Sequence, residues 1–183
     1  LKLLFNYELH SVLAVAISSA RHRLFIATAD LKNVQLLLAE RAAGGRGASF
    51  RCWMSSAAAE LKSVAAQRDT ERPFLHELKQ RRSPRFQLRR CPRVHAKAVI
   101  IDGRTMYLGS ANLTGAGLGA KSPRRRNFEA GIITDDIPLI DQMLDMLEAV
   151  WAGRHCPACD RKEHCPLPLE ANPFAPKRAA AAD

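Results

Sequence analysis

One short run of residues combines the side-chain types that phosphoryl-transfer chemistry uses. His95 and Lys97 stand two positions apart, Asp102 follows after four apolar residues, and a Gly-Ser-x-Asn segment comes at 109–112. A neutral imidazole is a good nucleophile near pH 7, and an ammonium binds phosphate as a point charge. Hydroxyl and amide groups donate hydrogen bonds to oxygens on which charge builds, a task that other enzymes give to magnesium. The run indicates phosphodiester cleavage without a catalytic metal.

The run resembles the HKD signature of the phospholipase D superfamily, including its downstream Gly-Ser-x-Asn. The resemblance covers about residues 8–151. It implies an α/β fold, an α/β/α sandwich with a mixed central β-sheet (phospholipase D-like). It also implies a two-step reaction in which His95 forms a covalent phosphohistidine that water then hydrolyses. Phosphate binding carries over to Lys97 and Asn112, and a supporting hydroxyl carries over to Ser110.

Two carboxylates complete the set of catalytic candidates. In the family a downstream carboxylate orients the histidine ring, and Glu129 in Asn127-Phe128-Glu129 fits that position. Asp102 precedes a glycine, and an Asp-Gly pair between two apolar runs is a strong hairpin signal. We therefore expect Asp102 to brace the hairpin or a nearby cation rather than to touch the substrate.

The chemistry needs two histidines, because one attacks phosphorus while a second protonates the leaving oxygen. The chain holds a single His-x-Lys sequence. The other five histidines lack that context: His10, His22, His76, His155 and His164. The mechanism therefore predicts a homodimer with one composite site, the arrangement that the resemblance implies for single-copy members such as the small bacterial endonucleases.

The net charge of +10 is concentrated on both sides of the run. One basic cluster spans 79–93 and a second spans 121–126. A charge run is often a solvated face, but clusters that bracket the catalytic candidates favour a track for phosphates. The substrate-binding candidates are Arg93, Lys121, Arg124, Arg125 and Arg126. Aromatic residues make up 6% of the chain, which argues against a protein that binds single strands by stacking bases.

Five cysteines are present, and three of them fall within ten residues: Cys156, Cys159 and Cys165. An odd number with this crowding favours a structural metal over disulfides and a reducing compartment, by default the cytoplasm. One possibility is zinc held by the three cysteines and either His155 or His164. The alternative is a [4Fe-4S] cluster, in which C-x2-C-x5-C joins a distant Cys91 or Cys52. Zinc is favoured because two local histidines can complete the set.

The periodicity of apolar residues predicts the elements that must position these groups. Helices are expected at 9–20, 30–43, 57–67 and 73–82, and after an Asp136 cap, with Gly153 closing the last one. Strands are expected at 24–28, 48–54, 86–90, 98–101, 105–108 and 127–134, with His95 and Lys97 on one strand. We expect a catalytic domain at 1–153, a Cys/His metal-binding module at 154–170 and a flexible tail at 171–183. The first residue is Leu, so the natural start is expected upstream, and the interrupted apolar face of 9–20 does not fit a signal peptide.

Three function classes fit these observations to different degrees. The favoured one is a metal-independent endonuclease, with DNA preferred over RNA as substrate and a helicase or a defence or repair protein as a possible partner. A phospholipase or phosphatidyl transferase would need an acyl groove or membrane anchor, and no apolar run reaches the ~20 residues of a membrane span. A non-catalytic module that only grips nucleic acid fits less well, because His95, Lys97 and Asn112 are all intact.

Overall fold

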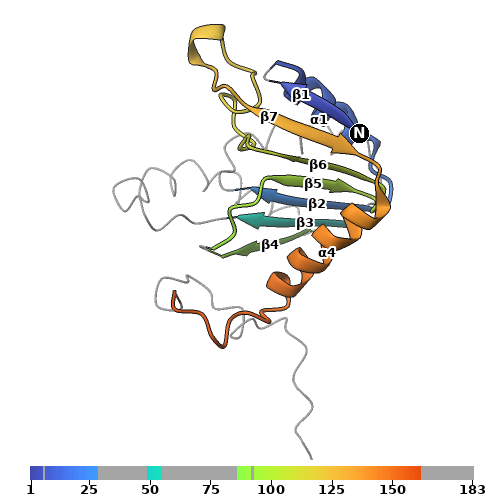
Figure 1. Ribbon diagram of the computed structural model, residues 1–183, viewed down its shortest axis with the longest axis vertical. Coiled ribbons are helices and arrows are strands. Elements are labelled where there is room, and N and C mark those ends of the chain that lie inside the picture. Colours follow the sequence, from blue (N-terminus) through green and yellow to red (C-terminus); the bar gives the residue numbers. More distant parts are fainter. Residues whose placement is uncertain (6, 29–48, 55–85, 92, 162–183) are drawn as a thin grey trace, which may run out of the picture.

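The computed structural model describes residues 1–5, 7–28, 49–54, 86–91 and 93–161 (Figure 1). These residues form a seven-stranded sheet in the order β1-β7-β6-β5-β2-β3-β4. The strands are β1 (Lys2–Phe5), β2 (Arg23–Thr28), β3 (Ser49–Met54), β4 (Phe86–Arg90), β5 (Ala98–Ile101), β6 (Thr105–Gly109) and β7 (Ala130–Thr134). The pairs β2–β3 and β3–β4 are parallel, and the other four pairs are antiparallel. The predicted mixed sheet is therefore confirmed.

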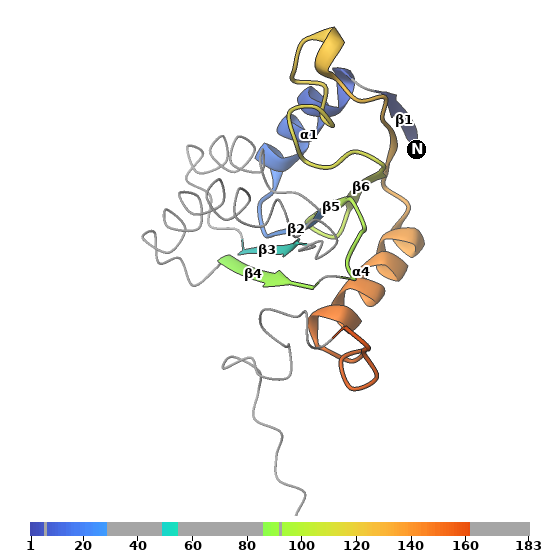
Figure 2. The ribbon, with the colours of Figure 1, turned by 90° about the vertical axis from the view of Figure 1, so that its left-hand side faces the viewer.

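A helix covers each face of the sheet. Figure 2 shows α1 (Tyr7–Ser19) and α4 (Ile137–Trp151) on opposite sides of it. The apolar stripe of α1 (Leu9, Leu13, Ile17) packs in one core with Ile26, Val99 and Tyr107. The stripe of α4 (Ile140, Leu147, Trp151) packs in a second core with Phe25, Ile100 and Met106. Successive residues of a strand point to opposite faces, so alternate residues of the central strands pack into the two cores. The predicted α/β/α sandwich is confirmed.

Local sequence signals account for the turn between β5 and β6 and for the start of α4. Asp102 and Gly103 both adopt a left-handed backbone, with φ of 54° and 68°, and Arg104 donates its backbone N–H to Ile101 at 2.9 Å. This turn joins β5 to β6 as the Asp-Gly pair predicts. At the start of α4 the Asp136 side chain accepts from the Leu139 N–H at 3.0 Å, which confirms the predicted N-cap.

Several sequence predictions need correction or fall outside the described residues. The strand β1 was not predicted, and β7 begins at Ala130 rather than at 127. His95 and Lys97 do not lie on a strand, because β5 begins at Ala98. The helices expected at 30–43, 57–67 and 73–82 lie outside the described residues, as do Cys165 and His164. Within the part of the chain that the structure describes, no helix is long and apolar enough to cross a membrane.

Candidate active site

The candidate catalytic residues gather where β5 begins and β6 ends. The register pairs Ala98 with Leu108, and one step further the Gly109 N–H donates to the Lys97 carbonyl at 3.1 Å. Immediately upstream the chain turns, since Val94 donates its N–H to Cys91 at 3.1 Å. His95 and Lys97 follow this turn and directly precede β5, so they lie at the edge of the sheet where β5 begins.

The Lys97 ammonium lies against the His95 ring. Its Nζ is 3.0 Å from Nδ1 and 3.2 Å from Nε2, and it donates to the His95 carbonyl at 3.0 Å. The lysine is 9% exposed, whereas His95 is exposed to solvent. Burial lowers the pKa of Lys97 below its ordinary value, and the negative charge of Glu129 opposes that shift. A cation and an imidazole are thereby held together with the ring open to an incoming group.

A carboxylate network joins the end of β6 to the residues that precede β7. Ser110 donates its hydroxyl to Glu129 at 2.5 Å, and the Asn127 side-chain amide donates to the other oxygen of Glu129 at 3.1 Å. The Ala130 N–H donates to the Ser110 hydroxyl at 3.2 Å. Glu129 is therefore fixed from both sides within electrostatic reach of Lys97. Sequence reasoning assigned no role to Asn127, although its spacing of two from Glu129 places both side chains on one side of an extended chain.

Asn112 presents a polar group that nothing else in the described residues satisfies. Its side-chain oxygen is buried without a hydrogen-bond partner there. The backbone around it is held, since the Leu113 N–H donates to the buried Thr28 hydroxyl at 3.3 Å and the Thr114 N–H bonds to the Asn112 carbonyl at 2.7 Å. A buried amide atom without a partner is uncommon in proteins. The unpaired oxygen is an acceptor and would take a donor, whereas a phosphate would be bound by the NH2 group of the same amide.

Two paired glycines, Gly109 on β6 and Gly131 on β7, pack against Tyr107 beside the site. Any side chain at Gly109 or Gly131 would collide with the ring or hydroxyl of Tyr107. Tyr107 is fully buried, and this burial raises its pKa to about 12. The register places Gly109 opposite Gly131, so the absence of both side chains lets the tyrosine fill the space under the Ser110 network.

Asp102 lies at the opposite end of β5 from His95. Its carboxylate accepts from the backbone N–H groups of Arg21, His22 and Arg23 at 2.8, 2.8 and 2.7 Å. Burial works to raise the pKa of Asp102, but the three N–H donors outweigh it and hold the pKa below its ordinary value. The structure thus does not bring Asp102 together with the other catalytic candidates, and its contacts are those of a brace between the hairpin and the start of β2.

The basic candidates divide into two groups. Lys121, Arg124 and Arg125 are exposed on the loop between β6 and β7, which projects from the site end of the sheet in Figure 1. Arg126 ties this loop by donating to the Lys121 carbonyl at 2.6 Å. The Asn127 N–H donates to the Ala116 carbonyl at 3.1 Å, so the base of the loop is attached beside the Glu129 network.

Arg93 lies with the cysteines instead. A hydrogen bond with the Cys159 side chain and the charge of that group raise the pKa of Arg93 above its ordinary value. Cys91 and Cys156 pack against the same core under α4, and the Cys159 N–H bonds to the Cys156 carbonyl at 3.1 Å. His155 is exposed. Among the described residues no group of three His, Cys, Asp or Glu is placed to hold a metal.

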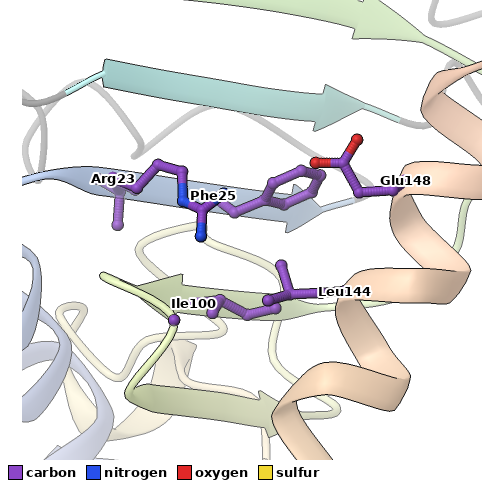
Figure 3. A pocket seen from close by; sticks show the side chains of 7 residues that line it. Arg23, Phe25, Ile100, Leu144 and Glu148 are labelled. Carbon is purple, nitrogen blue, oxygen red and sulfur yellow. The ribbon is translucent and has the colours of Figure 1, made fainter.

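A small pocket lies between β2, β5 and α4, away from these groups. Phe25, Ile100 and Leu144 line it, with Arg23 and Glu148 beside them (Figure 3). Gly103 of the hairpin also contributes to its wall, so the pocket is at the Asp102 end of β5. Because its walls are mainly apolar and no candidate catalytic residue lines it, we assign the chemistry to the His95 end.

Comparisons with known proteins found one matching family and several similar structures. Residues 13–151 match the family described as cardiolipin synthase, PLD-like domain. The structure is similar to NucT from Helicobacter pylori, with a TM-score of 0.60 at 19% identity over 80% of this chain and 92% of NucT. It is also similar to Nuc from Salmonella typhimurium, a phospholipase D family member, with a TM-score of 0.55 at 18% identity over 82% and 92% of the two chains.

A third similar structure is longer. Phosphatidylserine synthase from Haemophilus influenzae matches with a TM-score of 0.62 at 19% identity, over 81% of this chain and 38% of the synthase. No curated protein sequence matched the chain. At these identities the structural similarities establish the fold, and the substrate has to be argued from the site.

Proposed function

Because the chain belongs to the PLD-like domain family, whose members act on phosphodiester bonds, we propose that it is a metal-independent endonuclease with a composite active site in a homodimer. The observation that carries the proposal is the His95–Lys97 pair, in which a buried ammonium lies about 3 Å from the ring of an exposed imidazole. Asn112 lies in the segment that follows β6 at the same end of the sheet, and its side-chain NH2 group can donate to a phosphate oxygen. Together these residues provide a nucleophile and two groups for a phosphate.

The proposed reaction has two displacements at phosphorus. A phosphate oxygen is a stronger acceptor for an ammonium than an imidazole is, so phosphate binding to Lys97 releases a ring nitrogen of His95 for attack. The nitrogen–phosphorus bond forms as the bond to the leaving oxygen breaks, and that oxygen takes a proton from the imidazolium of His95 in a second chain. Water then attacks the phosphohistidine, gives its proton to the second imidazole and releases His95.

Nucleic acid is favoured over lipid as the substrate by the charges at the site. The loop 121–126 places exposed cations beside the Glu129 network, where a polyanionic backbone would extend beyond the scissile phosphate. Such contacts supply sequence-independent affinity. A lipid substrate would require an apolar groove for acyl chains at this end of the sheet, and the pocket found in the described residues lies at the other end. DNA is proposed ahead of RNA.

The experiment that tests the function is cleavage in the presence of EDTA. Labelled single- and double-stranded DNA and RNA, together with phosphatidylglycerol vesicles, are incubated with the wild type and with His95→Ala. We expect cleavage of nucleic acid that survives EDTA and is lost by at least about a thousandfold in the variant, since it lacks the nucleophile. Cleavage restricted to vesicles would assign a lipid substrate, and equal activity of His95→Ala would refute the mechanism.

We further propose that the C-terminal cysteines hold a structural metal, zinc ahead of an iron–sulfur cluster. The turn that pairs Cys159 with Cys156 is supporting evidence, since C-x2-C turns present two thiolates to one ion. His155 or His164 would complete the zinc site with Cys156, Cys159 and Cys165. Cys91, which packs against the same core as Cys156, would be the fourth ligand in the iron–sulfur alternative. Metal analysis of the purified protein should give about one zinc per chain with no visible absorbance. A brown protein containing iron would overturn the choice of zinc.

A further inference from the structure

The hydroxyl of Tyr107 is a buried polar group that the reaction described above does not use. Among the described residues, three buried side-chain atoms have no hydrogen-bond partner: the Tyr107 hydroxyl, the Asn112 side-chain oxygen and His10 Nε2. Burying a polar group without a partner is unfavourable. Phenylalanine would fill the same space without that penalty, so the hydroxyl of Tyr107 calls for a role of its own.

The Tyr107 hydroxyl lies beside the residue that would bind the phosphate. The Gly109 N–H donates to the Lys97 carbonyl at 3.1 Å, and Gly109 pairs in turn with Gly131. These three residues therefore form one row across the sheet. A side chain on either glycine would collide with the ring or hydroxyl of Tyr107. The tyrosine oxygen thus occupies the place next to Lys97 that a side chain at position 109 would take.

The segment that follows β6 packs on the same side of the sheet as Tyr107. Ala111 and Leu113 are buried in the α1 core together with the tyrosine. Burial raises the pKa of Tyr107 to about 12, and the nearby Ala111 N–H opposes that rise. The hydroxyl therefore keeps its hydrogen near neutral pH. Asn112 comes directly after Ala111, and its side-chain oxygen is buried although the residue as a whole is half-buried.

We propose that the Tyr107 hydroxyl is the donor for the Asn112 side-chain oxygen in the phosphate-bound site, and that Tyr107 is thereby a positioning residue. A hydroxyl has one hydrogen to donate, and an amide oxygen accepts through two lone pairs. The two unpaired groups are complementary. This step rests on the proposed function, in which Lys97 and Asn112 bind the phosphate.

The orientation of the amide decides whether Asn112 attracts or repels a phosphate. The two ends of an amide are similar in shape, but one end donates hydrogen bonds and the other accepts them. With its oxygen toward a phosphate, Asn112 would place one acceptor against another. A donor behind the oxygen selects the opposite orientation, in which the NH2 group faces the phosphate.

Glu129 is the other acceptor near the tyrosine, since its charge adds to the rise in the pKa of Tyr107. Both Glu129 carboxylate oxygens already accept, one from Ser110 and the other from Asn127. The Asn112 oxygen accepts from none of the described residues. Asn112 is therefore the acceptor that lacks a donor, and Tyr107 is the buried donor without an acceptor.

Phosphate binding tests this role without any cleavage. The 15N-labelled protein is titrated with inorganic phosphate and followed by NMR at the backbone N–H groups of residues 109–113. Tyr107→Phe removes the hydroxyl and keeps the ring. The affinity for phosphate should fall by about three- to tenfold, the effect of one hydrogen bond between neutral groups. In an Asn112→Ala background the same change should have no effect, because the group through which the hydroxyl acts is gone.

Val99→Ala is the matched control for a general loss of packing. Val99 is the cross-strand partner of Tyr107 and lies in the same core. The change creates space beside the ring but keeps the hydroxyl, so it should lower the melting temperature at least as much as Tyr107→Phe. The affinity for phosphate should stay within about twofold of wild type, because stability and the orientation of Asn112 are separate effects.

Three results would overturn the role of Tyr107. The first is an unchanged phosphate affinity in Tyr107→Phe, and the second is an equal loss in Val99→Ala. The third is the same loss in the Asn112→Ala background, which would show that the hydroxyl acts through Glu129 or through the fold. A protein that shows the expected pattern of phosphate binding but cleaves no diester in EDTA would refute the proposed function and leave the role of Tyr107 standing.

Discussion

The aspartate of the HKD run is predicted to act on stability rather than on catalysis, and Asp102→Ala separates the two roles. The carboxylate accepts three backbone N–H bonds of 2.7–2.8 Å. A hydrogen bond to a charged group contributes about 1.5–3 kcal/mol when buried, and solvent reaches this site, so we take about 0.5–1 kcal/mol for each. The left-handed backbone of Asp102, with φ 54°, adds about 1 kcal/mol for alanine. The expected loss is about 2.5–4 kcal/mol of unfolding free energy.

Asp102→Asn is the graded partner of this variant. His22 and Arg23 donate to one carboxylate oxygen and Arg21 to the other. An amide can keep the oxygen that serves two donors but presents an NH2 group to the third, and asparagine tolerates the left-handed backbone. The expected loss is therefore about 1–2 kcal/mol, roughly half that of alanine.

The difference between wild type and Asp102→Asn should depend on pH in a defined direction. The folded-state pKa of Asp102 is depressed, so its stabilising effect is present in full above the unfolded pKa of about 3.9 and disappears as the pH falls through the folded value. Urea unfolding at pH 7 and at pH 3 should show the gap between the two proteins narrowing in acid. A gap that widens in acid would contradict the assigned bonds.

The activity of the same variants decides the role. At a temperature where Asp102→Asn is fully folded, its rate on bis(p-nitrophenyl) phosphate should stay within about threefold of wild type, because the carboxylate lies at the far end of β5 from Lys97. A loss of a hundredfold or more in a protein of undiminished stability would refute the structural assignment and return Asp102 to the catalytic set.

Two further predictions concern the groups around the phosphate. Replacing Arg124, Arg125 and Arg126 by alanine should weaken DNA binding and lower the slope of log affinity against log salt concentration by up to about 3, as measured by fluorescence anisotropy. Cleavage of bis(p-nitrophenyl) phosphate should be nearly unchanged. Equal losses on both substrates would place these arginines in the catalytic site or the fold. Burial lowers the pKa of Lys97 and Glu129 opposes that shift, so the alkaline limb of the pH–rate profile should lie below the ordinary lysine range and move lower still in Glu129→Gln; an unmoved limb would show that Lys97 does not set it.

The parts of the fold that the sequence predicts are those decided by neighbouring residues. The hairpin follows from an Asp-Gly pair between two apolar runs, since those residues tolerate the left-handed backbone of the turn. The last helix follows from the Asp136 cap and apolar residues spaced by threes and fours. In both cases residues within a few positions of one another determine the local structure, so the turn and the helix can be predicted without knowing what the rest of the chain does.

The parts that the sequence did not predict depend on distant partners. β1 is four residues long and becomes a strand by pairing with β7, more than 120 positions later in the chain. The role of Asn127 likewise appears when Ser110, at the end of another strand, meets Glu129. The strand expected to include His95 and Lys97 begins at Ala98 instead, just after a turn from Cys91 to Val94, and short-range periodicity does not include the pairing with β6 that sets this boundary.

The spacing of the HKD run can be understood as the length of one buried strand. β5 comprises four consecutively buried residues between Lys97 and Asp102. At about 3.3 Å per residue, five steps separate these two residues by roughly 16 Å, too far for one phosphate to contact both. Lys97 has to lie at the end of β5 that is next to Ser110 and Asn112, which follow β6. Asp102 has to lie at the other end, where it accepts hydrogen bonds from the backbone N–H groups at the start of β2. Successive side chains of a strand point to opposite faces, so a strand one residue longer or shorter would turn either Lys97 or Asp102 to the wrong face. The spacing of the run therefore serves phosphate binding at one end of β5 and stability at the other, although the two side chains do not touch.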